Sequence, residues 1–442
     1  MMFPYWNQSY LALMGGDSGA MAVHYGLTRV IQSVIHLVVF PLTSTLSDTV
    51  GRKHLMTWGR LGTAAFMILH RFRDRSPAHR LWMEQICWPL SNACWPVFAA
   101  SHSDLFADRP ELSAQIQAAD GLWVNVVGIS GGVCTSFVSR YLSDSAGQEI
   151  GAALTLAQIV ICQTMPETLS ATERKPFECW ELLKRVNPVS NGLLLFKKGP
   201  GLRRLALSTF CWFVCNQVWA TQTAFRMGVL GWSPVQLSYF TSGYDGIGVV
   251  AQAVFVNRML ASLGNRMSME VGALVSVASY LLQGLCMFPA GHAGVRSNVQ
   301  YILAIALLQT APEAMKYASR AMIVKQGLAV YGGEVGRGEL SGAYAGLGTL
   351  TGLFSSLLWG SLYQFFLRGA TAGTAPTWLR WGKGGHFYVA AWLNLIVFAV
   401  MRTTAASTLL FLDEEQRPVA SASVSPRANR AAYSGDVKED PD

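Results

Sequence analysis

Titratable side chains stand inside apolar runs of this sequence. Arg29, Gln32 and His36 lie three and four residues apart in one such run. The spacing predicts that they share one face of a helix. A basic face with a titratable imidazole would suit an anionic ligand or a proton relay. The alternative is that Arg29 extends to a water interface while His36 is a hydrogen-bonded packing residue.

Further polar groups interrupt other apolar runs. Asp245 stands in the string "SGYDGIG", where its carboxylate could take up a proton or bind a cation. The alternative is a structural acid paired with a base. Asn216 and Gln217 lie in a run that also holds tryptophans. Amides of this kind line mostly apolar pockets, and they equally form hydrogen bonds between helices.

The composition is that of a protein that spans a membrane. Of the 442 residues, 51% are hydrophobic and only 14% are charged, and the mean hydropathy is +0.29. A soluble protein carries about 25% charged residues. The net charge of +8 fits basic residues at the cytoplasmic ends of spans. The composition therefore predicts an integral, multi-pass membrane protein. Because no basic stripe with interleaved aromatic residues is present, we expect no nucleic-acid partner.

Apolar runs define the expected elements, because a helix of about 20 apolar residues crosses the hydrocarbon core. The runs are long and do not alternate, which argues against barrel strands and predicts an all-α polytopic membrane protein. Eleven spans are expected, at residues 22–46, 54–71, 81–101, 117–139, 147–166, 202–224, 236–257, 267–288, 298–322, 340–366 and 385–403.

A polar connector divides these spans into two bundles. It covers residues 167–201, where basic and acidic residues are interspersed. We expect a central cytoplasmic linker there, between an N-terminal bundle at 1–166 and a six-helix C-terminal bundle at 202–412. Residues 413–442 are rich in Ser, Ala, Pro and charged residues, and this composition predicts a disordered tail.

A short charged loop occurs in both bundles. The string "LSDTVGRKHL" separates two apolar runs, and an offset of 213 residues aligns Gly51 with Gly264 and a second glycine eight residues further on in each copy. Gly51 permits a tight turn, and the basic pair Arg52 and Lys53 favours the cytoplasmic surface. Two halves built on one plan are typical of secondary transporters.

The first copy of the loop and the run before it resemble a known family. The segment "HYGLTRVIQSVIHLVVFPLTSTLSDTVGRKHLM" resembles the second span and following loop of the major facilitator superfamily, most of all its drug:proton antiporters of the tetracycline-resistance type. The string "MPETL" at 165–169 resembles the end of that family's sixth span. The resemblance implies twelve helices in two six-helix bundles around a central path that opens alternately to each side.

The resemblance also implies a conformational latch at this loop. In the family, the acid at the position of Asp48 contacts a helix of the other half and stabilises one conformation. The latch would consist of Asp48, Gly51, Arg52 and Lys53. The alternative is a solvated turn whose charges only orient the protein in the membrane.

The sequence departs from the family pattern in several places, of which two follow. The offset between the halves puts the start of the first span before Met1, so about eleven of twelve spans are expected, in an N-terminally truncated sequence or a natural eleven-span variant. In "VVGISGGV", Ile129 takes the proline position of the antiporter motif. The glycines of that motif are kept, and we expect close helix packing at Gly128, Gly131 and Gly132.

The expected function is secondary active transport of a small organic solute by alternating access, with proton-coupled efflux as its antiporter form. The alternative is a non-transporting relative that acts as a sensor or interaction protein. Neither an H-E-x-x-H string nor a P-loop is present, so we expect no enzyme activity, cofactor or metal site. The expected partners of this monomer are a small solute, protons and the lipid bilayer.

Overall fold

The computed structural model of the chain is built from helices. It describes residues 11–70 except 13, 144–169, 188–287, 294–331, 337–371 and 382–404, together with residues 174 and 335 and scattered positions between 97 and 141. No strand occurs among these residues, so the all-α prediction is confirmed for them. Most of the predicted spans at 81–101 and 117–139 and the whole predicted tail lie outside the described residues.

The described helices lie on both sides of the polar connector. Before the connector, the described helices are α2 (Ser18–Val50), α3 (Arg52–His70) and α7 (Asp144–Thr164). From the connector onward they are α9 (Pro188–Lys197), α10 (Pro200–Asn216), α11 (Trp219–Gly228), α12 (Pro234–Ala251), the π-helical turn η3 (Gln252–Val256), α13 (Asn257–Leu285), α14 (Val295–Leu308), α15 (Ala311–Tyr331), α16 (Arg337–Thr371) and α17 (Gly385–Thr403).

Several of these helices have the length and composition of membrane spans. Among the described residues, four stretches qualify: Ser18–Phe40, Val235–Leu285, Gly342–Ala370 and Gly385–Thr403. α7 adds a shorter apolar stretch, Glu149–Thr164. Exposed leucine, isoleucine, valine and phenylalanine side chains cover much of the outer surface of these helices, as expected where lipid is the solvent.

The structure breaks two spans that the sequence predicted as continuous. The predicted span at 202–224 is divided between α10 and α11. At the break, the Trp359 indole N–H donates to the Val214 carbonyl at 2.6 Å. The Val218 N–H donates to the Cys215 carbonyl rather than to that of Val214. The predicted span at 298–322 ends at Leu308 and resumes as α15. Pro312 lacks an N–H and its ring would clash with the carbonyl four residues earlier, which accounts for the second break.

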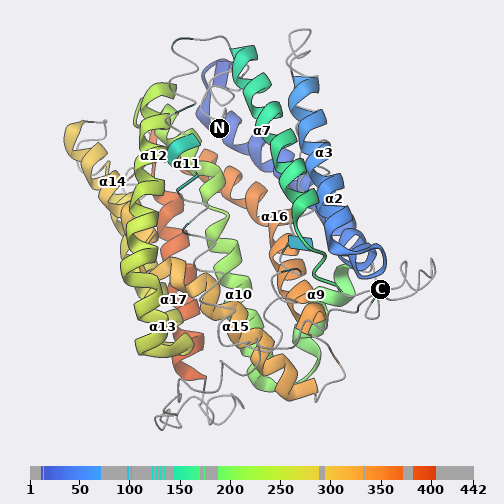
Figure 1. Ribbon diagram of the computed structural model, residues 1–442. Coiled ribbons are helices and arrows are strands. Elements are labelled where there is room, and N and C mark those ends of the chain that lie inside the picture. The colour runs from blue at the N-terminus through green and yellow to red at the C-terminus, as the bar shows by residue number, and fades with distance from the viewer. Residues whose placement is uncertain are drawn as a thin grey trace, which may run out of the picture.

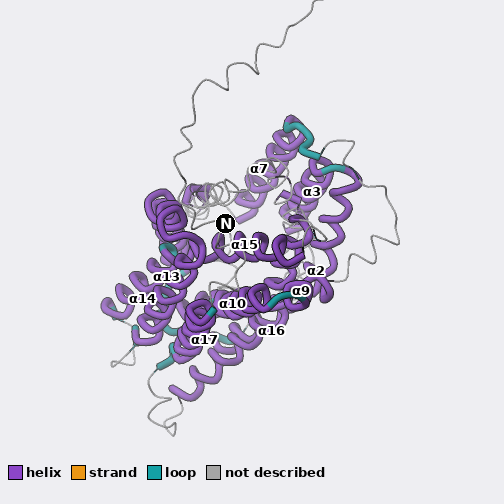
Figure 2. The backbone as a smooth tube through the Cα atoms, turned by 90° about the horizontal axis from the view of Figure 1, so that it is seen from below, coloured by secondary structure: helices purple, strands orange, loops and turns teal. Residues whose placement is uncertain are grey.

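The helices form two groups that meet along α2 and α16. In Figure 1, α2, α3 and α7 stand on one side and α12, α13, α14 and α17 on the other, with α10 and α16 between them. The view from below in Figure 2 shows the same division. α2 makes its most extensive contact with α16, a helix of the opposite group, while α3 packs on α7.

The connector contains a packed helix that the prediction of a polar linker did not include. The apolar string "GLLLF" lies in α9, and Leu195 is fully buried in one of the hydrophobic cores of the second group. α9 packs against α16 and α10. The last part of the predicted linker is therefore attached to the helices that follow it, because its apolar residues are buried by them.

Candidate functional site

The contact between α2 and α16 is a seam of small residues. A Cβ atom on Gly26 would lie 2.6 Å from the Ser356 carbonyl oxygen, and one on Gly360 would lie 2.6 Å from the Ala22 carbonyl oxygen. Both obstacles are backbone atoms, which no side-chain rotation removes. The two helices approach this closely only because these positions are glycines.

The seam occupies the first half of α2, away from the loop at Asp48. Ser33 Oγ lies 2.8 Å from the position of a Cβ on Gly352, and the hydroxyls of Ser18 and Tyr363 form a 3.1 Å hydrogen bond. Ser18 also touches Gly228 at the end of α11. These contacts join the two helix groups along the first half of α2, away from Asp48.

Arg29, Gln32 and His36 share one side of α2, as their spacing predicted. Arg29 Nη1 donates to Gln32 Oε1 at 3.2 Å, and Nη2 donates to the Tyr25 hydroxyl at 2.9 Å. The His36 ring stacks on Phe40 with centroids 4.2 Å apart. Its Nε2 is buried and has no hydrogen-bond partner among the described residues, so the prediction of a hydrogen-bonded packing histidine is not met at this atom.

Asp245 lies apart from this group. It is half-buried in α12 and forms no ion pair or hydrogen bond with Arg29, His36 or any other described residue. The neighbouring Tyr244 stacks on Trp219, with ring centroids 5.6 Å apart. The structure therefore does not join the α2 group and Asp245 into one cluster.

Asn216 and Gln217 lie at the break between α10 and α11. Asn216 is exposed, while Gln217 Oε1 accepts a 3.3 Å hydrogen bond from Ser356 Oγ of α16. Ser356 is also the residue whose carbonyl faces Gly26 across the seam. The helix break, α16 and α2 are thus connected through one residue.

The predicted latch loop is held by Glu167, which follows α7 in the "MPETL" string. Its carboxylate accepts the backbone N–H of Arg52 at 2.9 Å and that of Lys53 at 3.2 Å. A carboxylate at this place caps α3 and interacts favourably with the positive end of its dipole. Gly51 (φ 108°, ψ 153°) lets the chain turn directly beneath it. The "MPETL" string alone does not indicate that Glu167 contacts this loop.

The charged residues of this loop form ion pairs with residues of their own half of the chain. Asp48 Oδ1 lies 2.6 Å from Arg52 Nη1, and Arg52 also bonds Ser47 Oγ. Arg174 Nη2 lies 3.9 Å from Glu167 Oε2. The resemblance implied that Asp48 contacts the other half, whereas among the described residues Asp48 pairs with Arg52.

Protonation of Glu167 should loosen this loop. Burial alone would raise the pKa of Glu167, but the N–H groups of Leu169, Arg52 and Lys53 and the charge of Arg174 outweigh it, so the pKa lies below its usual value. An acid whose pKa is lower in the folded than in the unfolded state stabilises the fold. Its contribution is present in full at pH values above the unfolded-state pKa of about 4.3, and it is lost as the pH falls through the folded-state pKa.

We expect Glu167→Gln to lower the free energy of unfolding at pH 7 by about 1 kcal/mol, the typical size of a helix cap. It should also flatten the pH dependence of unfolding below about pH 4.3. Thermal unfolding of the detergent-solubilised chain between pH 3 and pH 7 measures both effects. Glu149→Gln, at an exposed acid within α7, is the matched control, and an equal response of the two variants would contradict this role of Glu167.

The second copy of the loop repeats the glycine turn. Gly264 interrupts the helical backbone of α13 with φ 70° and ψ 172°. Gly51 and Gly264 both have a positive φ with an extended ψ, a combination that is essentially confined to glycine. The alignment of these two glycines in the sequence therefore corresponds to a shared backbone conformation.

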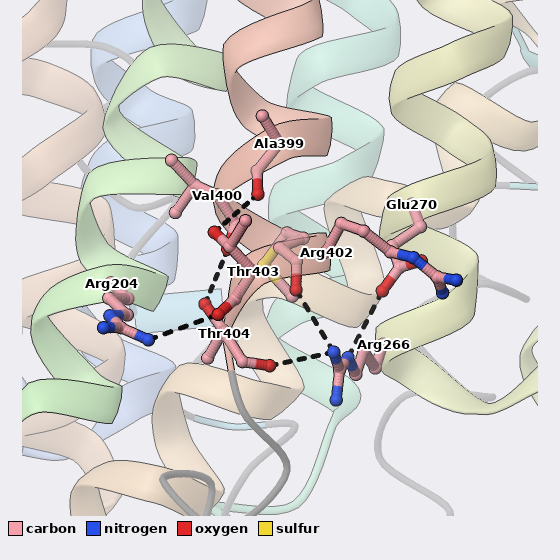
Figure 3. A network of polar contacts seen from close by, with 9 residues as sticks. Arg204, Arg266, Glu270, Ala399, Val400, Arg402, Thr403 and Thr404 are labelled. Atoms are coloured by element: carbon pink, nitrogen blue, oxygen red, sulfur yellow. Dashed lines mark hydrogen bonds and ion pairs between the residues drawn. The ribbon is translucent and has the colours of Figure 1, made fainter.

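Charged residues after Gly264 form hydrogen bonds and an ion pair with the C-terminal end of α17. Arg266 donates to Glu270 at 3.2 Å and to the carbonyl oxygens of Thr404 at 2.8 Å and Met401 at 3.3 Å (Figure 3). Arg402 lies 3.5 Å from the other oxygen of Glu270. Basic groups at unsatisfied carbonyls of a helix C-terminus are stabilising. In each half, a glycine turn is thus followed by a charged contact to another helix of the same half.

An arginine that sequence reasoning missed lies inside the second helix group. Arg226 of α11 is 2% exposed, yet the predicted span ended at residue 224. Its Nη2 donates to Gln222 Oε1 at 2.8 Å and its Nε to the Tyr301 hydroxyl at 3.2 Å. Trp219, Gln222 and Arg226 have the same three-and-four spacing as Arg29, Gln32 and His36, which is the signal that could have revealed it.

The remaining predicted residues give little further geometry. Gly128 and Gly132 lie outside the described residues, whereas Gly131 is helical. Their predicted packing role stays a prediction. Within the described part of the chain, no group of three or more His, Cys, Asp or Glu is placed to hold a metal ion.

Comparisons with known proteins identify the fold. No protein-family profile matches the sequence, and no curated protein sequence matches it. Among solved structures, the chain is similar to the human organic anion transporter MFSD10 (TETRAN), with a TM-score of 0.63, 18% identity and 90% of each chain covered. It is also similar to a D-xylose–proton symporter, with a TM-score of 0.66, 12% identity and coverage of 91% of this chain and 92% of that one.

A third similar structure is a transporter of the major facilitator superfamily. It is the MFS (major facilitator superfamily) proton:xylose symporter XylE bound to 6-bromo-6-deoxy-D-glucose, with a TM-score of 0.61, 11% identity and 91% of each chain covered. The chain has the fold of these transporters, an all-α polytopic membrane fold, as the sequence predicted. The drug:proton antiporter branch is not confirmed by these similarities.

Proposed function

We propose that the chain is a secondary transporter that moves a small organic solute across a membrane by alternating access. The observation that carries this proposal is the glycine seam between α2 and α16, which lies between the two helix groups of a fold shared with transporters. Helices that touch through glycines and small side chains can part and meet again with little repacking. An alternating-access mechanism requires such a reversible contact between its halves.

The two glycine loops support the same proposal. Glu167 fixes α3 to the end of α7, and Arg266 with Glu270 fixes α13 to α17. Each half thereby holds its own helices together at a turn. We infer that the halves move as rigid units, with the strain of the motion concentrated at the seam.

Flux through purified protein in proteoliposomes tests the proposal. Labelled D-xylose and para-aminohippurate are suitable probes, because the structural neighbours include a xylose symporter and an organic anion transporter. Uptake above that of protein-free liposomes, with either probe, supports the proposal. A correctly folded protein that moves neither probe under any ion gradient would favour the alternative, a sensor or interaction protein of the same fold.

We propose that Asp245 carries a proton in the transport cycle. Its carboxylate lies in an apolar helix without a partner among the described residues, and unpaired acids within spans are costly unless they serve a function. The similarity of the loop motif favours antiport, whereas the xylose neighbours are symporters. The orientation of the pH gradient that accelerates uptake distinguishes these two modes. We place the working protein in the bilayer as a monomer.

Replacement Asp245→Asn should abolish the acceleration of uptake by a pH gradient, because the amide cannot take up the proton. Exchange of labelled for unlabelled solute at equal pH should persist, since it needs no net proton movement. Both rates are measured in the same proteoliposomes. Asp245→Glu, which keeps a titratable group, should retain part of the acceleration, and an undiminished response in Asp245→Asn would exclude this role.

A further inference from the structure

Arg226 is a buried cation in a helix of the second group. Its guanidinium lies 5.1 Å from the Trp219 ring centroid, 4.4 Å from that of Phe240 and 5.7 Å from that of Tyr301. These rings and the Gln222 amide are neutral. Cation–π contacts stabilise a desolvated guanidinium by about 2 kcal/mol or more. They do not replace the counter-charge that a buried cation requires.

No described carboxylate supplies that counter-charge. The acid on the adjacent helix α12, Asp245, forms no ion pair with Arg226, and within the described residues the guanidinium bonds only to Gln222 and Tyr301. A guanidinium carries five N–H donors in a planar fork. These two bonds use Nε and one hydrogen of Nη2, so Nη1 and the second Nη2 hydrogen have no described acceptor.

The Nη1–Nη2 edge of Arg226, where Nη1 has no acceptor among the described residues, has the geometry of a carboxylate site. Nη1 and Nη2 present two parallel donors, which match the two oxygens of a carboxylate in a bidentate pair. The Gln222 amide extends the polar contact to Gln283 at 3.5 Å, and Gln283 bonds Ser279 at 3.1 Å. These buried neighbours orient the guanidinium and add no negative charge.

Trp219 is the most exposed of the three rings that contact Arg226. It is 44% exposed, whereas Arg226 is 2% exposed, and its ring contacts both the guanidinium and Tyr244. Trp219 follows the break between α10 and α11, where the helical hydrogen bonds are already interrupted. Movement of this ring would remove one of the three rings that contact the guanidinium and leave Phe240 and Tyr301 in place.

We propose that Arg226 is the binding site for the carboxylate of an organic anion with an aromatic body, covered by Trp219 in the conformation described. The planar body of such an anion takes the place of the Trp219 ring against Tyr244 and Phe240. This inference rests on the proposed transport function for its purpose, and it names the class of solute that the function would move.

Binding of labelled benzoate to the purified full chain tests the site, with benzamide as a neutral analogue of the same shape. Wild-type protein should bind benzoate, and unlabelled benzoate should displace the label at least about tenfold better than benzamide, since a charge-assisted pair contributes that much. Arg226→Gln should weaken benzoate binding at least about tenfold, and Arg226→Lys should retain the preference for the charged analogue. Arg204→Gln, at an exposed arginine of α10, is the control.

Three results would overturn the site: no benzoate binding by the wild type, equal competition by benzamide, or unchanged binding in Arg226→Gln. If Arg226→Gln does not fold, the competition ratio in the wild type and in Arg226→Lys decides. The two proposals fail separately. D-xylose flux without benzoate binding overturns the anion site alone, whereas Arg226-dependent benzoate binding in a protein without any flux overturns the transport function alone.

Discussion

Gly360→Ala is expected to reduce solute flux at least about tenfold while the protein still folds, because overpacking of a close contact costs about 1–3 kcal/mol. The new methyl group would lie 2.6 Å from the Ala22 carbonyl oxygen and 3.0 Å from Val23 Cα, both of them backbone atoms of α2. The conformation in which α2 and α16 touch would lose that free energy, whereas the conformation in which they part would not. The cycle would then spend little time in the closed-seam state.

A matched control lies on the same helix. Gly342 is exposed, and a Cβ there meets no atom within 4 Å. Gly342→Ala should therefore leave flux unchanged and stabilise α16 by up to about 1 kcal/mol through helix propensity. Initial rates in proteoliposomes and unfolding in detergent compare the two variants. Equal flux in both would show that the seam does not take part in the cycle.

Gly51→Ala is expected to lower the free energy of unfolding by about 2–4 kcal/mol, the largest loss of stability among these substitutions. Two causes add. Alanine is strained at φ 108°, and its Cβ would lie 2.5 Å from the Glu167 oxygen that accepts the Lys53 N–H. Relief of that clash would move the carboxylate away from the start of α3 and remove its cap.

The strain and the clash can be measured separately. Gly231 also has a positive φ, 70°, but a Cβ there would meet no atom within 4 Å. Gly231→Ala should lose only about 1–2 kcal/mol of stability, because the backbone strain is then the single cause. Denaturant titration of the detergent-solubilised variants gives both values. If Gly51→Ala proves no less stable than Gly231→Ala, Glu167 does not hold the loop as described.

Much of the fold could be predicted because its signals are local. Long apolar runs gave the helices of the second group, and the repeated glycine in "VGRKHL" and "LGNRMS" marked two turns that share a backbone conformation. The spacing of Arg29, Gln32 and His36 correctly placed them on one side of α2. A periodic pattern or a glycine that must adopt a positive φ is visible in the sequence itself.

The missed features depend on contacts between distant residues. At the break after α10, the Val214 carbonyl accepts the indole N–H of Trp359, which lies more than 140 positions later. No local pattern near Val214 predicts this contact. The predicted span stopped two residues before Arg226 because charged residues were taken to end the apolar runs. The pairing of Glu167 with the loop at Gly51 and the packing of α9 likewise require knowledge of which helices are neighbours.

A reversible cross-link across the seam tests alternating access most directly. A cysteine at Gly352 would place its Cβ 3.7 Å from the Cβ of residue 33, within the range of disulfides, so Ser33→Cys with Gly352→Cys should form a bond under oxidation. The initial uptake rate in proteoliposomes is measured before and after reduction, with oxidised wild type as the control. We predict arrest in the oxidised double variant and recovery on reduction. Equal uptake in the oxidised and reduced states, or no uptake in either, would contradict the account.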